Sequence, residues 1–382
     1  MIKSVSGSQA ARAGGGAPPA VGERLQALVD RTVSRRGIGH AVAGLEQRDG
    51  QRWIVAAGDA RPGEPMRPDT PFFIASVTKR FIATLALQAC ERGELALDDL
   101  IVSHLPAELI GGLHVRKGVD HTPAITVHHL LTHTSGLPDY WDKPKAGPSL
   151  YQQLVRGEDQ SWGLADVVQM ARDDHRPHFA PQDLAAPRQR ARYSDTGFQL
   201  LIAILEAATA RSFAELLHDR IFDPVGMRHS WLPGRSDPIA EAAEPALIHV
   251  GRRPLELPQL VVSCNDLVST AGDLLRFQRA LVGGELFDER ATVAMLTERA
   301  NLLRNMPPNR YGVGTWIFPV NRLIAPGRRP TTLVGHAGAT GTWLFTASQL
   351  DVHLVGSVDQ AKGQRMPFRL MAQILRAWHG AT

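Results

Sequence analysis

The chain has 382 residues, of which 43% are hydrophobic and 21% are charged. These values are typical of a folded globular protein and argue against a disordered or membrane-embedded chain. The formal net charge is +4, but the arginines stand singly or in pairs and alternate with acidic residues. Because nucleic-acid binding needs basic side chains gathered in one patch, we expect no nucleic-acid partner.

Two further features of the sequence bear on the compartment. Cys90 and Cys264 each lie in an apolar stretch, which favours buried free thiols over a disulfide and fits a reducing compartment. The first 20 residues contain no apolar run of the ~7–15 residues that a secretory signal needs. No later run approaches the ~18 apolar residues of a membrane span. We therefore expect a cytoplasmic protein without a membrane partner; its oligomeric state is open.

The predicted elements begin after residues 1–20, whose Gly, Ala, Ser and Pro content predicts a flexible tail. A helix is expected from residue 21, and strands are expected over 40–45 and 52–57. A stronger helix follows Ser76, because apolar residues recur there at helical spacing over about four turns.

The expected secondary structure differs between the middle and the end of the chain. Helices alternate with Pro- and Gly-rich loops from about residue 95 to 258, with the clearest helix at Phe198–Ala208, and the mixed stretch 142–187 allows no assignment. A helix over Thr270–Leu281 comes next. The expected strands after it are Gly312–Phe318, Thr331–Val334, Thr342–Thr346 and Val352–Ser357, and a helix over Met366–Trp378 closes the chain.

This order predicts an α/β fold of the α+β kind. Strands near both ends indicate one antiparallel sheet, flanked by helices and built discontinuously from residues 21–94 and 259–382. Residues 95–258 are then a mostly helical domain inserted into it. We expect the active site in the cleft between the two parts.

The first candidate motif is Ser76-Val77-Thr78-Lys79, at the expected start of a helix. Unpaired N–H groups at a helix start favour a developing negative charge, and Lys79 lies one turn along on the same face. Ser76 is thus a candidate nucleophile, and Lys79 can tune its proton. The same residues also fit an N-cap serine followed by a surface lysine.

The second candidate motif is Tyr193-Ser194-Asp195, just before a predicted helix. A phenol beside an ammonium loses its proton more easily and can move a proton to and from Ser76. Asp195 also fits a helix cap. Tyr140 is a rival tyrosine, but no helix follows it, so we prefer Tyr193 as the proton carrier.

The third candidate is His336-Ala337-Gly338-Ala339-Thr340-Gly341, between two strand-like runs. Its small residues let a substrate approach the strand edge, and the Ala339 N–H can serve as an oxyanion donor. A plain glycine-rich hairpin is the alternative. Gly338, Tyr140 and Trp343 are the candidate substrate-binding residues. Trp141, Trp231, Trp316 and Trp343 can form an apolar acyl pocket, with core packing as the alternative for each; Trp343 is favoured because it follows this motif closely.

Together and in this order, the three segments resemble the serine β-lactamase and penicillin-binding-protein superfamily, especially its class C branch. That branch also contains D-alanyl-D-alanine carboxypeptidases, D-aminopeptidases, esterases and transesterases. The connecting stretches Leu130–Pro138 and Ser269–Leu274 are similar to the family as well. The resemblance extends over about residues 22–378 and implies the β-lactamase/transpeptidase-like fold.

The resemblance also implies roles for individual residues. Ser76 is acylated, Tyr193 is the general base and acid, and the N–H groups of Ser76 and Ala339 hold the oxyanion. Whether lysine or tyrosine is the working base stays open. Asp195 stands where the common pattern has asparagine, and it can pair with the catalytic lysine. His336 replaces a lysine that binds carboxylates, lines the third side of the site, and disfavours an efficient β-lactamase.

We therefore expect a serine hydrolase that acts on a small ester or amide through a Ser76 acyl-enzyme. The alternative is an acyltransferase that passes the acyl group to an alcohol or amine. A β-lactamase, a D-alanyl-D-alanine carboxypeptidase and a non-catalytic binding protein are less favoured. We expect no cofactor and no metal. His129 and His133 are four residues apart and could lie on one face of a helix, but the carboxylate of a His-Glu-x-x-His motif is missing.

Overall fold

The computed structural model describes residues 20–34, 37–320, 331–362 and 365–379. Almost all of the tail predicted for residues 1–20 therefore lies outside the described residues. Within the described ranges, no helix is both long and apolar enough to cross a membrane.

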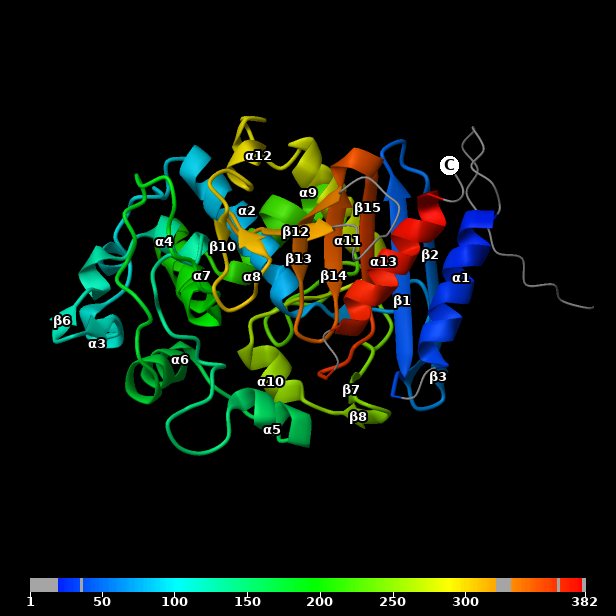
Figure 1. Ribbon diagram of the computed structural model, residues 1–382, viewed down its shortest axis with the longest axis horizontal. Helices are drawn as coiled ribbons and strands as arrows, with labels where there is room; N and C mark the ends of the chain where they lie inside the picture. The colour runs from blue at the N-terminus through cyan, green and yellow to red at the C-terminus, as the bar shows by residue number, and fades with distance from the viewer. Residues whose placement is uncertain (1–19, 35–36, 321–330, 363–364, 380–382) are drawn as a thin grey trace, which may run out of the picture.

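A large antiparallel sheet forms the centre of the fold (Figure 1). Within the described residues it has nine strands in the order β10-β11-β12-β13-β14-β15-β1-β2-β3. The strands are β1 (His40–Gln47), β2 (Arg52–Arg61), β3 (Glu64–Pro65), β10 (Asn301–Leu302), β11 (Arg310–Tyr311), β12 (Trp316–Val320), β13 (Thr331–Ala337), β14 (Trp343–Ala347) and β15 (Val352–Ser357). β1 pairs with β15, with Val42 opposite Ser357. The predicted sheet, assembled from both ends of the chain, is therefore confirmed.

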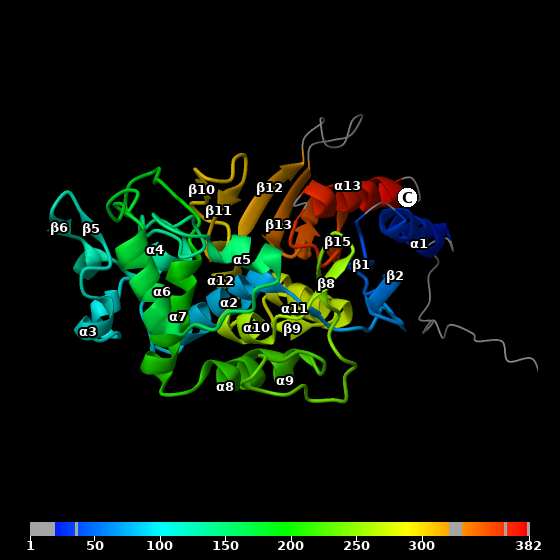
Figure 2. The same ribbon diagram turned by 90° about the horizontal axis from the view of Figure 1, so that it is seen from below.

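Helices cover both faces of this sheet. α1 (Ala20–Val33) and α13 (Arg365–His379) lie on one face, and α11 (Ala271–Gly283) lies on the other (Figure 2). Because both faces are covered, all residues of β15 are buried, and its sequence is a mainly apolar run rather than an alternation. α2 (Thr78–Glu91) packs against α7 (Asp195–Thr209), which joins the sheet to the helical part of the chain.

The other elements are short, and most of them lie in the chain between the N-terminal strands β1–β3 and the C-terminal strands β10–β15. The helices are α3 (Ala107–Ile110), α4 (Val127–Leu131), α5 (Leu150–Arg156), α6 (Leu164–Gln169), α8 (Phe213–Leu217), α9 (Asp223–Val225), α10 (Pro258–Ser263) and α12 (Thr292–Met295). The strands are β4 (Phe72–Phe73), β5 (Val115–Arg116), β6 (Val119–Asp120), β7 (Ile248–Val250), β8 (Arg253–Leu255) and β9 (Val268–Ser269). The middle segment contains short helices separated by loops, and it also contains the β5–β6 and β7–β8 hairpins. The domain boundaries at residues 94/95 and 258/259 stay a prediction.

Two apolar clusters stabilise these layers. The main cluster fills the space between the sheet and its covering helices. A smaller second cluster joins β4 to the helical segment, and its buried members include Phe73, Tyr140, Leu154, Trp162 and Leu260. Because β4 leads directly into α2, this second cluster fixes the segment that carries Ser76.

Candidate active site

Ser76 lies in a sharp turn between β4 and α2. The preceding residue, Ala75, has a φ of 47°, a left-handed backbone conformation that is uncommon for residues other than glycine. A single 3₁₀ turn, Ala75–Val77, leads into α2, so the Ser76 hydroxyl stands at a helix N-terminus. Lys79, one turn along and 3% exposed, places Nζ 3.2 Å from Ser76 Oγ. The turn therefore presents the serine and the lysine to the same space.

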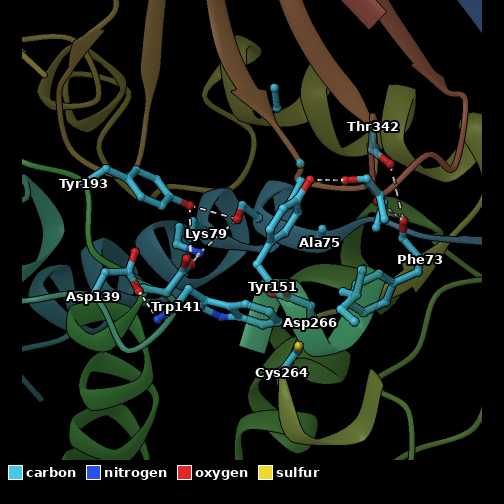
Figure 3. Close-up of a pocket in the computed structure, with 18 of the residues that line it drawn as sticks. Phe73, Ala75, Lys79, Asp139, Trp141, Tyr151, Tyr193, Cys264, Asp266 and Thr342 are labelled. Atoms are coloured by element: carbon cyan, nitrogen blue, oxygen red, sulfur yellow. Dashed lines mark hydrogen bonds and ion pairs between the residues drawn. The ribbon is translucent and has the colours of Figure 1, made fainter. Parts of the chain in front are cut away.

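Tyr193 reaches the same hydroxyl from the loop before α7. Its phenol oxygen lies 2.8 Å from Ser76 Oγ and 3.4 Å from Asp195 Oδ1 (Figure 3). Asp195, the first residue of α7, forms an ion pair with the Lys79 ammonium. The structure thus brings the first two sequence motifs together around one oxygen atom.

The Asp195 carboxylate decides the charge state of Lys79. Burial by itself would lower the pKa of Lys79, but Asp195, and then Asp266, outweigh burial and raise that pKa above its ordinary value. Lys79 is therefore an ammonium over the whole physiological pH range. It can donate a hydrogen bond to Ser76 Oγ, but it is poorly suited to act as the base.

Tyr193 is also held in its protonated form. Burial, followed by the negative charge of Asp195, raises the pKa of Tyr193 well above its ordinary value, and the hydrogen bond with Ser76 offsets this only in part. A resting phenolate is thus disfavoured. Any proton that Tyr193 accepts must be matched by the release of its own proton to a neighbouring acceptor.

Two more carboxyl groups face this site, Asp266 and Asp139, and neither was among the predicted site residues. Burial raises the pKa of Asp266 to about 7, with Lys79 opposing and Asp195 adding to the shift. Burial and the charge of Asp195 also raise the pKa of Asp139 well above its ordinary value. No periodicity or spacing marks either residue in the sequence. The only indication in the sequence was that Asp139 immediately precedes Tyr140, which was already a candidate substrate-binding residue.

The three motifs border a cavity of about 480 Å³ (Figure 3). Aromatic and aliphatic side chains make up most of its wall. The lining residues include Phe73, Tyr140, Trp141, Tyr151, Leu154, Leu260, Cys264, Met306, Trp316 and Phe368, together with Ser76, Lys79, Tyr193 and the three aspartates. A largely apolar cavity with a few convergent polar groups is the usual form of a small-molecule site.

The turn between β13 and β14 forms another wall. Gly338, Ala339 and Thr340 line the cavity, and the Gly338 N–H donates to Thr342 O at 2.8 Å. A side chain at Gly338 would come within 2.6 Å of the Ile74 carbonyl oxygen, so glycine is needed for this close approach. Thr342 Oγ1 also donates to Phe73 O at 3.3 Å. These contacts hold the third motif beside the turn that carries the nucleophile.

His336 and Trp343 do not lie where the sequence analysis expected them. Both are fully buried and absent from the cavity wall. His336 bonds with the Tyr311 hydroxyl at 3.1 Å and stacks on Trp316, and burial lowers its pKa well below its ordinary value. Trp343 packs over Gly356 of the neighbouring strand. The expectation that they line the site is corrected: His336 supports Trp316 from behind, and Trp343 belongs to the core.

Tyr140 lines the cavity, as expected of a substrate-binding candidate, and it is 3% exposed. Its backbone N–H donates to Thr196 Oγ1 at 3.1 Å, which ties its loop to α7. His133 belongs to the connecting stretch Leu130–Pro138 that resembles the family; its ring packs 4.5 Å from the Tyr193 ring and its Nδ1 accepts the Ser194 N–H at 3.3 Å. His133 therefore positions the loop that carries Tyr193.

Comparison with known proteins identifies the family of this chain. The family model described as Beta-lactamase matches residues 25–375. Esterase EstB from Burkholderia gladioli is 35% identical over 212 residues, which are 54% of this chain and 50% of the esterase. The D-alanyl-D-alanine-carboxypeptidase/endopeptidase AmpH from Escherichia coli K12 is 25% identical over 315 residues, which are 78% of this chain and 75% of AmpH. The chain thus matches only about half the length of the esterase.

Solved structures show the same fold. The D-amino acid amidase from Ochrobactrum anthropi SV3 with D-phenylalanine superposes with a TM-score of 0.72, at 22% identity, over 95% of this chain and 99% of the amidase. A D-stereospecific amidohydrolase from Streptomyces gives a TM-score of 0.69 at 24% identity over 91% of this chain and 97% of its own. The fold is therefore of the β-lactamase/transpeptidase-like kind, and the chain belongs to the Beta-lactamase family.

Proposed function

We propose that this protein is a serine hydrolase that cleaves small esters or amides through an acyl-enzyme on Ser76. The observation that carries the proposal is the convergence on Ser76 Oγ of the Tyr193 phenol at 2.8 Å and the Lys79 ammonium at 3.2 Å. A nucleophile within hydrogen-bonding reach of a proton carrier that is itself oriented by a third group is the arrangement that acyl transfer requires.

In acylation, Ser76 Oγ attacks the substrate carbonyl carbon. The serine proton passes to the Tyr193 oxygen, and the phenol proton passes to the Asp195 carboxylate, 3.4 Å away. The Lys79 ammonium stabilises the negative charge that develops on Oγ, and the Ser76 and Ala339 N–H groups are assigned to the carbonyl oxygen. The carbonyl–leaving-group bond then breaks, and the leaving group takes a proton from Tyr193, which recovers its own from Asp195.

In deacylation, a water molecule takes the place of the leaving group. Tyr193 accepts a proton from the water as it attacks the acyl carbon, and Asp195 again receives the phenol proton. The bond between the acyl carbon and Ser76 Oγ breaks, and the proton returns through Tyr193 to the serine. An alcohol or amine at the position of the water would complete acyl transfer by the same steps.

The charge of the cavity favours substrates without a carboxylate beside the scissile bond. Among the described residues that line it, Lys79 is the sole lysine or arginine, whereas Asp139, Asp195 and Asp266 are acidic. The Lys79 ammonium is already paired with Asp195. A substrate carboxylate would therefore find no unpaired cation, and above about pH 7 it would also face the ionised Asp266 in a partly buried site. This favours neutral esters and amides over β-lactams, and it agrees with the esterase relative.

Turnover of p-nitrophenyl acetate by the full chain tests the proposal. We expect release of p-nitrophenol by the wild type and by Ser103→Ala, an exposed serine used as the matched control, and loss of turnover in Ser76→Ala. Full activity in Ser76→Ala would overturn the proposal. Adding a primary alcohol separates the two outcomes of the acyl-enzyme: acetic acid indicates hydrolysis, and an acetate ester of the alcohol indicates transfer.

A further inference from the structure

Tyr151 spans the cavity from the helical segment to the end of the sheet. It belongs to α5, and its hydroxyl donates to the carbonyl oxygen of Ala361, 210 residues away, at 2.9 Å. Both residues line the cavity that contains Ser76. In Figure 3 the Tyr151 ring stands between the Lys79 and Tyr193 side of the cavity and the Phe73 and Thr342 side. The ring and its hydrogen bond thus form a bridge across the binding space.

The helix that carries Tyr151 is firmly held. Ser149 and Gln152 form a capping box at its start, and Leu154 anchors it in the second apolar cluster. At its end, the Arg253 guanidinium donates to the carbonyl oxygens of Val155 at 2.8 Å and Arg156 at 3.2 Å. The Tyr151 side chain therefore projects from a fixed base, although it is itself 39% exposed.

Ala361, which accepts the hydrogen bond from Tyr151, is also firmly held. Ala361 is 2% exposed, and its N–H donates to His249 O at 2.9 Å. The preceding residue, Gln360, donates its N–H to Thr340 O at 2.7 Å, and its side chain bonds with Gly251 in both directions. The residue next to Ala361 is thus hydrogen-bonded to the β13–β14 turn that borders Ser76.

We infer that Tyr151 is a specificity-determining residue that limits the length of the acyl group. On the far side of the Tyr151 ring from Lys79 and Tyr193 lies Phe73, a cavity-lining residue of the second apolar cluster (Figure 3). With the Tyr151 ring in place, an acyl chain that extends from Ser76 towards Phe73 meets the ring first. Short acyl groups fit, and long alkyl chains are excluded. The inference rests on the proposed function for its catalytic readout.

The test compares kcat/KM for p-nitrophenyl acetate, butyrate and octanoate. In Tyr151→Ala we expect the octanoate-to-acetate ratio to rise about tenfold or more, because each further methylene that gains apolar contact adds to the binding of the transition state. Tyr151→Phe keeps the ring and loses the hydrogen bond, so its ratio should stay within about threefold of the wild type. Gln153→Ala, on the same helix but outside the cavity wall, is the matched control and should match the wild type.

An unchanged ratio in Tyr151→Ala, with acetate hydrolysis intact, would overturn the inference and leave the proposed function standing. A binding measurement, which does not depend on catalysis, tests the role of Tyr151 even if the protein hydrolyses no ester. Trp141 and Trp316 line the cavity, so their fluorescence reports the binding of 1-octanol. We expect Tyr151→Ala to bind 1-octanol several-fold more tightly than the wild type. Equal affinities would overturn the role of Tyr151 even if no ester is hydrolysed.

Discussion

The Tyr193 phenol oxygen lies 2.8 Å from the Ser76 hydroxyl oxygen, although 117 residues separate the two in the chain. The contact exists because α2 and α7 pack against each other and bring the two sequence motifs together. Asp195 then acts on both sides of the contact: it pairs with Lys79 and raises the pKa of Tyr193.

Asp195→Asn should lower kcat/KM, because the acceptor of the Tyr193 proton is lost, and it should change the pH dependence of the activity that remains. In the wild type, Asp195 raises the pKa of Lys79 above its ordinary value, so loss of the ammonium does not limit activity at alkaline pH. Without this carboxylate, burial lowers the pKa of Lys79 against the remaining effect of Asp266, and the pKa of Tyr193 falls as well. The alkaline limb should move to lower pH in a profile measured from about pH 6 to pH 10. An alkaline limb at the same pH in both proteins would contradict the assigned charge of Lys79.

Asp266→Asn should stabilise the protein above neutral pH. Burial raises the folded-state pKa of Asp266 to about 7, above that of the unfolded chain. The folded state therefore binds more protons in this window, and stability falls as the pH rises from about 4 through 7. Removing the charge should add up to about 4 kcal/mol to the free energy of unfolding at pH 8 and little at acid pH. Urea unfolding measures the difference, with the exposed Asp69→Asn as control. A gain equal at both pH values would refute the buried charge.

The two tryptophans of the β12–β14 region should respond differently to the same substitution. Trp343 is buried in the core and Trp316 lines the cavity. Trp343→Phe should lower the free energy of unfolding by about 1–3 kcal/mol and leave KM within about threefold of the wild type. Trp316→Phe should raise KM by about three- to tenfold with a smaller loss of stability. A larger change of KM in Trp343→Phe than in Trp316→Phe would reverse the assignment.

Anionic substrates should be poor. Among the described residues of the cavity wall, the one lysine is paired with Asp195, and Asp266 adds negative charge once the pH exceeds about 7. For two esters of equal size at pH 8, one neutral and one with a carboxylate next to the acyl carbon, we expect kcat/KM to differ at least about a hundredfold in favour of the neutral ester. A β-lactam should be hydrolysed as slowly as the anionic ester. Equal rates for both esters would show that the carboxylates do not set the specificity.

The fold could be predicted largely from patterns in the sequence. The helix after Ser76, the helix after Asp195 and the strands from both ends of the chain occur where periodicity indicates them. The stretch 142–187 could not be assigned, because α5 and α6 are short helices held by caps and by contacts with distant residues such as Arg253. Periodicity carries no signal for an element stabilised in that way.

The site was predictable only in part, for a related reason. The order of three motifs was enough to name Ser76, Lys79, Tyr193 and Asp195, which the structure brings together. Which face of a strand points into the cavity depends on register, and this is why His336 was misplaced. The wall residues Asp266 and Tyr151 come from loops and short helices, so only the folded chain brings them to the cavity.

The most direct test of the acyl-enzyme is the mass of the protein after brief exposure to an activated ester. We expect the wild type to gain the mass of one acyl group, and peptide mapping to place that group on Ser76. Tyr193→Phe should acylate about 10²–10⁴-fold more slowly at unchanged folding, because the proton carrier is missing. An acyl group on another residue, or acylation of Tyr193→Phe at the wild-type rate, would contradict the account.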